Sequence, residues 1–148
     1  HLSIRRQRQM CIRDSDNTAP TGFKALNLFS KIMGTTKTLK SDKFTTAQSN
    51  KFVFTGKRLT TLNVFASVSA KASATEDMNS YSIAIMKNGK EIILPNSTVS
   101  SVPKNAGFQL NLQTQVEMIA DDYIEVHIKN NNSTTSVIVS DFQFKVSE

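Results

Sequence analysis

The sequence has 148 residues, which is enough for one domain with a sizeable hydrophobic core. Hydrophobic residues make up 39% of the chain, and five glycines and three prolines are too few for a collagen-like or low-complexity protein. The single cysteine, Cys11, excludes an intramolecular disulfide and a zinc site built from several thiolates. Apolar runs are only a few residues long, so we expect no insertion into a membrane.

The formal net charge is +6, and half of it lies in residues 1–15, where four arginines stand against one aspartate. Over the rest of the chain the lysines are scattered rather than clustered. A protein that binds nucleic acid usually presents its basic residues together, often interleaved with aromatic ones. We therefore expect no nucleic-acid partner.

The N-terminal residues differ from the rest of the chain. Residues 1–15 resemble a string produced when sequencing-adapter DNA is translated, so we predict that they are a non-native segment. The alternative is a basic arm that touches an acidic surface or nucleic acid. Residues 16–36 contain Pro20, Gly22 and several spaced apolar residues, and we predict a linker or peripheral packing segment there, extended rather than helical.

From residue 37 apolar and polar residues alternate, as in strands with one buried face. The clearest run is Arg58–Ala70. Asn88-Gly89 between two alternating runs predicts a tight hairpin, because both central residues of its turn need positive φ. The other expected strands are Lys37–Phe44, Asn50–Thr55, Asn79–Met86, Glu91–Leu94, Ala106–Ile119, Tyr123–Lys129 and Thr135–Val146.

Pro95 is expected to end the strand that begins at Glu91, and residues 96–105 to form a long polar connection. The whole pattern predicts one all-β domain over residues 37–148, cleanest from about Phe44. About eight to ten short strands with turns between them indicate an antiparallel sandwich or barrel.

Residues suited to catalysis or metal binding are few. His127 and Glu125 share one strand face, where a hydrogen bond or weak metal site is one interpretation and ordinary surface placement the other. The pairs Asp121-Asp122 and Glu76-Asp77 lack the spacing of a calcium loop, and no nucleophile elbow or phosphate-binding glycine loop is present. We predict a protein that is not an enzyme, with no metal site and no cofactor.

Three segments in this order resemble a known family. They are Gly56–Val68, the hairpin Ser82–Lys90 with its Lys-Asn-Gly turn, and Ile119–Val126 with its Asp-Asp-Tyr start. They are similar to the jelly rolls of tumour necrosis factor and complement globular heads. They are most similar to structural proteins of bacteriophages and marine viruses that use this fold on tail fibres or capsids. The acidic turn departs from the family pattern, because Asp121-Asp122 stands where Gly-Asp is usual.

The resemblance implies a jelly-roll β-sandwich and a homotrimer, since the family usually assembles as trimers. Apolar side chains on polar strand faces are what an interface between subunits would show. Three residues meet this description and are our candidates for the trimer interface: Phe65, Tyr123 and Ile138. Local packing under a loop is the alternative for each of them.

The functional hypothesis is a non-enzymatic viral structural protein located in the virion. It would be a trimeric module on a phage tail fibre or capsid surface, with other virion proteins and a host surface glycan or protein receptor as partners. The connections at residues 71–78, 95–105 and 130–134 are the expected binding surfaces. The alternative is a carbohydrate-binding β-sandwich, secreted by a bacterium or held on its surface. The scarcity of tyrosine and the absence of tryptophan argue against it.

Overall fold

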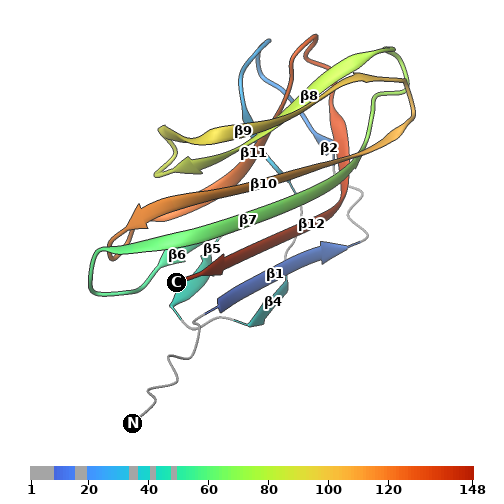
Figure 1. The fold of residues 1–148 in the computed structure, drawn as a ribbon. Helices are drawn as coiled ribbons and strands as arrows, with labels where there is room; N and C mark the ends of the chain where they lie inside the picture. Colours follow the sequence, from blue (N-terminus) through green and yellow to red (C-terminus); the bar gives the residue numbers. More distant parts are fainter. Residues whose placement is uncertain (1–8, 16–19, 34–36, 41–42, 48–49) are drawn as a thin grey trace.

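The computed structural model describes residues 9–15, 20–33, 37–40, 43–47 and 50–148. They form two antiparallel sheets that face each other (Figure 1). The strands are β1 (Gln9–Ser15), β2 (Pro20–Thr21), β3 (Ser30–Lys31), β4 (Lys37–Lys40), β5 (Phe44–Ala47), β6 (Lys51–Phe54), β7 (Thr60–Lys71), β8 (Asn79–Lys87), β9 (Glu91–Val102), β10 (Gly107–Met118), β11 (Tyr123–Asn130) and β12 (Val137–Ser147).

The first sheet, here called sheet A, has the order β10-β7-β12-β1-β4, and β2 also pairs with β12. Sheet B has the order β5-β6-β11-β8-β9, and β3 also pairs with β11. The predicted all-β sandwich is therefore confirmed. The described residues contain no helix that is long and apolar enough to span a bilayer.

Strict alternation of side chains builds the long strands of sheet A. Every second residue of β10 is buried, and β7 pairs with it without a register shift from Thr60 opposite Met118 to Lys71 opposite Gly107. The inward residues of the two strands meet the inward face of sheet B, as expected when one face of each sheet packs on the other. The outward residues form a mostly polar surface over β10, β7 and β12.

Two aromatic stacks join the sheets through the core. Phe52 of β6 lies parallel to Phe144 of β12, with ring centroids 4.3 Å apart, and Tyr81 of β8 stacks in the same way on Phe108 of β10 at 4.4 Å. All four side chains are buried. Each stack joins one residue of sheet B to one residue of sheet A, so each holds the two layers at a fixed distance.

A β-bulge in β12 changes which positions of the strand point inward. Val137 and Val139 point inward, and so do Phe142 and Phe144. The inward residues are therefore odd-numbered at the start of the strand and even-numbered further on. The pairing with β7 shifts register between Val139 and Asp141, which moves the inward face by one residue. Ile138 therefore points outward at the start of the strand, and 40% of its surface is exposed.

The prediction that Pro95 ends its strand is wrong, because β9 runs on from Glu91 to Val102. The strand passes the proline with a bulge: Ile85 pairs with Ile93 and Ile83 with Ser97, so Ala84 alone faces residues 94–96. β9 lies at the edge of sheet B, where a proline without an N–H donor is tolerated. The predicted polar connection shrinks to residues 103–106.

Strands from before residue 37 also belong to the two sheets. β1 pairs with β12 from Gln9 opposite Ser147 to Ser15 opposite Asp141, while β2 and β3 add two residues each. The expected strand Lys37–Phe44 is two strands, β4 in sheet A and β5 in sheet B. That residues 1–15 are non-native, and that the domain begins at residue 37, stay predictions.

Gly56 should be the least replaceable of the glycines that the structure describes. It is buried beside Phe54, and a Cβ atom there would lie 2.7 Å from Cε1 of the fully buried ring. We expect Gly56→Ala to lower the free energy of unfolding in urea by about 1–3 kcal/mol, the usual cost of overpacking. Gly22→Ala is the control, because no heavy atom lies within 4 Å, and it should change stability by less than about 0.5 kcal/mol. Equal effects of the two substitutions would contradict this account.

Candidate functional site

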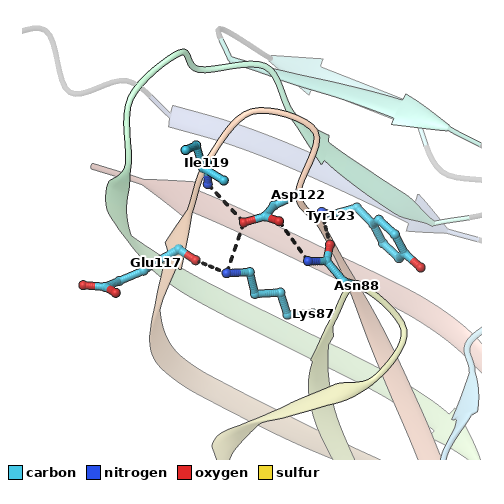
Figure 2. A network of polar contacts seen from close by, with 6 residues as sticks. All are labelled: Lys87, Asn88, Glu117, Ile119, Asp122 and Tyr123. Carbon is cyan, nitrogen blue, oxygen red and sulfur yellow. Dashed lines mark hydrogen bonds and ion pairs between the residues drawn. The ribbon is translucent and has the colours of Figure 1, made fainter.

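Two of the three segments that carried the family resemblance, Ser82–Lys90 and Ile119–Val126, meet at one end of the sandwich, around a set of contacts that we call the clasp. It joins the β8–β9 hairpin to the turn between β10 and β11 (Figure 2), and the end of β6 bonds to the same turn. Asn88 is its centre: its Nδ2 donates to Oδ1 of Asp122 at 2.8 Å, and its Oδ1 accepts from the Tyr123 N–H at 3.0 Å. The Asn88 N–H donates to the Tyr123 carbonyl at 2.9 Å.

The second carboxylate oxygen of Asp122 completes the clasp. Oδ2 accepts from the Ile119 N–H at 3.1 Å and pairs with Nζ of Lys87 at 3.1 Å, as Figure 2 shows. Partial burial raises the pKa of Asp122, but the hydrogen bonds from Asn88, Ile119 and Lys87 lower it more, so the carboxyl stays ionised. The Phe54 N–H donates to the Asp122 carbonyl at 2.8 Å, which ties the strand before Gly56 to the same turn.

The backbone of the clasp follows the predicted turn chemistry. Asn88 and Gly89 both have positive φ, 52° and 68°, as the Asn-Gly prediction requires. Asp121 has a φ of 71°, and this is the position where the family pattern has glycine. Asp tolerates this region better than most residues, so the departure from Gly-Asp keeps the turn.

Glu125, His127 and Lys31 form a second cluster, on the outer face of sheet B. The Glu125 carboxylate lies 2.8 Å from Lys31 Nζ and 3.0 Å from His127 Nε2, so the hydrogen bond considered for the Glu125–His127 pair is present. Burial raises the pKa of Glu125, but the bonds from His127 and Lys31 and their charges lower it more, to about 2. No group of three or more potential metal ligands occurs among the described residues. The cluster fixes β3 against β11.

At the opposite end, here called the loop end, the connections around residues 72–78, 103–106 and 131–136 meet. The Asp77 carboxylate accepts from the Lys104 N–H at 3.0 Å, and the Asn105 N–H donates to the Ser73 carbonyl at 3.0 Å. Ser133 donates to the Glu76 carboxylate. Hydrogen bonds from Ser133, from Thr135 and from Asn79 lower the pKa of Glu76 despite an opposing effect of burial.

A hollow with a volume of about 370 Å³ opens between these connections, β2 and the end of β7. Lys71, Asn105, Ser136 and Ile138 are among the residues that line it. Residues 71–75 and Asn105 of this lining fall within two of the connections expected to form binding surfaces, 71–78 and 95–105, whereas no residue of 130–134 lines the hollow. That these connections bind a partner stays a prediction. The other lining residues lie outside the expected ranges: Pro20, Thr135, Ser136 and Ile138.

The three interface candidates do not lie together. Phe65 is partly exposed at the middle of the outer face of sheet A, where it borders a hollow of about 430 Å³ together with Gln113, Gln143 and Lys145. Ile138 lies on the same face at the loop end, opposite Lys71 of β7. Tyr123 lies on sheet B instead, and Lys51 Nζ is 3.7 Å from the centre of its ring. Their role in an interface stays a prediction.

Replacing Asn88 by glycine tests the clasp without disturbing the turn, since glycine accepts positive φ. The substitution removes two side-chain hydrogen bonds, and we expect the free energy of unfolding in urea to fall by about 1–2 kcal/mol. Asn105→Gly is the matched control: its φ is 60°, and its side chain has no partner among the described residues. It should change stability by less than about 0.5 kcal/mol, and an equal loss would show that the Asn88 bonds contribute nothing.

Glu125 should make stability depend on pH in the acid range. Its pKa is lowered from 4.5 to about 2, so its contribution is complete above about pH 4.5 and is lost as the pH falls through about 2. One pKa unit corresponds to about 1.4 kcal/mol, so the contribution is up to about 3 kcal/mol. In urea unfolding, Glu125→Gln should therefore be less stable than the parent at pH 7 and approach it near pH 2.

Glu117→Gln is the control for this experiment, because Glu117 is exposed and its side chain has no partner among the described residues. Its stability relative to the parent should not change between pH 7 and pH 2. If Glu125→Gln showed the same flat difference, the ion pairs of Glu125 would carry no net stability.

Comparison with known proteins identifies the fold. No protein-family model matches the chain, and no curated protein matches it in sequence. The Eiger TNF from S. frugiperda is similar in structure, with a TM-score of 0.64 and 12% identity over 95% of this chain and 93% of that one. The globular domain of zebrafish complement 1qA protein has a TM-score of 0.65 and 8% identity over 95% and 96% of the two chains.

A viral protein is also among the similar structures. The PRD1 vertex protein P5 has a TM-score of 0.57 and 10% identity, covering 95% of this chain and 96% of that one. At such low identity these likenesses establish the fold alone. The chain is a two-sheet antiparallel jelly roll of the tumour necrosis factor and complement globular-head type.

Proposed function

We propose that the protein is a non-enzymatic structural module of a virus particle, which assembles as a homotrimer and contacts a receptor or neighbouring virion proteins. The observation that carries the proposal is the outer face of sheet A: a mostly polar surface with a hollow beside a partly exposed phenylalanine, Phe65. The structural likeness to a vertex protein of PRD1 supports a place on a virion.

Assembly into a ring requires two different patches on each subunit. The hollow around Phe65 supplies one of them, since it is wide enough for an apolar side chain of a neighbour. Leu94 supplies the other, because it protrudes from the edge strand β9 with 71% of its surface exposed. β9 and β10 are edge strands of 12 residues each, and they contact each other where the Thr114 hydroxyl donates to the Leu94 carbonyl at 2.7 Å.

The polar character of sheet A shapes the expected interface. Gln113 and Lys145 lie opposite Phe65 on the two neighbouring strands. Gln143 is two residues from Lys145 along β12, on the same face. Amide side chains carry both donors and acceptors, so they can bond to polar groups of either kind on a neighbouring copy. We therefore expect an interface with one apolar contact at Phe65 and a polar rim of hydrogen bonds and bridging waters around it.

Multi-angle light scattering on the purified chain tests the proposal. A trimer of 16.4 kDa subunits has a mass of about 49 kDa. Phe65→Gln and Leu94→Gln should each shift the mass toward the monomer at micromolar concentration, because each removes one side of the apolar contact. Leu26→Gln is the control, since Leu26 is exposed in the β2–β3 connection, away from both patches, and the trimer should persist. A parent protein that stays monomeric would refute the trimer.

A further inference from the structure

We propose that the hollow at the loop end binds a sugar residue that carries a carboxylate. The inference deepens the receptor-binding role proposed above and rests on it for its biological meaning. The hollow itself is built from residues of one chain: β2, the end of β7, and the connections at residues 103–106 and 131–136. A monomer therefore contains the whole site.

The walls of the hollow are held in place before any ligand arrives. Asp77 joins the β7–β8 connection to Lys104, and Ser133 joins the β11–β12 connection to Glu76. The Ala72 N–H donates to the Ala106 carbonyl at 2.9 Å, which closes the wall beside the end of β7. A site that is already ordered loses less conformational entropy when it binds.

The polar groups that face the hollow are open to a ligand. Lys71, Asn105 and Ser136 are exposed, and none of their side chains has a hydrogen-bond or ion-pair partner among the described residues. Lys71 lies opposite Gly107 on β10 and opposite Ile138 on β12. Because glycine has no side chain, the partner residue on β10 does not crowd the Lys71 amine. Together these groups offer an ammonium, an amide and a hydroxyl to one ligand.

The charge of the hollow favours an anionic ligand. Lys71 is the one charged residue in the lining, and no carboxylate faces the hollow among the described residues. The two acids of the neighbouring connection, Glu76 and Asp77, lie outside the lining, where they accept hydrogen bonds from Ser133 and from the Lys104 N–H. A hydrogen bond from an ammonium to a carboxylate is among the stronger ones available.

The apolar part of the lining favours a sugar over a simple anion. Pro20 and Ile138 present carbon atoms at one side of the hollow, and a sugar ring has a face of C–H groups that can pack on them. The volume of about 370 Å³ lies at the lower end of the range of about 300–1,000 Å³ for small-molecule sites. One sugar residue with its substituents matches that size.

Backbone amide chemical shifts measured by NMR test the site, with glucuronate and glucose as a matched pair that differs in the carboxylate. Glucuronate at millimolar concentration should shift the amides of residues 71–75, 105 and 135–138. Glucose should bind about tenfold more weakly, the effect of one charge-assisted hydrogen bond. Lys71→Gln should abolish this preference, and Ser136→Ala should weaken both sugars.

Lys104→Gln is the matched control, because Lys104 lies at the same end but its side chain does not line the hollow. It should bind glucuronate as the parent does. Any of four results would overturn the inference. Glucose could bind as tightly as glucuronate, or acetate could cause the same shifts. The shifts could fall outside the hollow, or glucuronate could fail to bind at millimolar concentration.

Light scattering on the same samples separates this test from that of the assembly. A trimer that does not bind glucuronate refutes the hollow and leaves the trimeric module standing. A monomer that binds it supports the hollow and refutes the trimer.

Discussion

The stacking of Phe52 on Phe144 and of Tyr81 on Phe108 is the interaction on which the rest of this structure depends. Each pair takes one ring from either sheet, and each contributes about 0.5–1.5 kcal/mol beyond the area that it buries. Phe52 lies near the clasp, since it pairs with Ile124 of β11, whereas Phe108 lies beside Ala70 near the loop end. With the layers fixed near both ends, the clasp and the hollow each rest on a rigid support.

The fold class and most strands could be predicted, because alternation in β7 and β10 and the Asn88-Gly89 turn are local signals. The errors arose where tertiary pairing overrides such a signal. β9 continues past Pro95 because it is an edge strand with a bulge, and edge position is a property of the assembled sheet. The bulge in β12 likewise becomes visible only against its partner β7.

The clasp and the hollow also combine features that local sequence shows with features that only the folded chain shows. The motifs Lys-Asn-Gly and Asp-Asp-Tyr were recognised as turns, but only the fold shows that Asn88 bonds directly to Asp122 and Tyr123. Lys71 and Asn105 fall in connections that were expected to form binding surfaces, but local patterns could not predict that they meet Ser136 in one hollow. Such residues meet because strand order places the ends of β7, β9 and β11 together, and no local pattern encodes strand order.

The strand order also means that neither sheet is a continuous piece of chain. Apart from the connections β1–β2, β5–β6 and β8–β9, every connection between successive strands passes from one sheet to the other. Removing one sheet would therefore cut the chain of the other sheet into separate pieces. We expect such an interwoven topology to unfold in one cooperative step, in which a local change at either end lowers the stability of the whole sandwich.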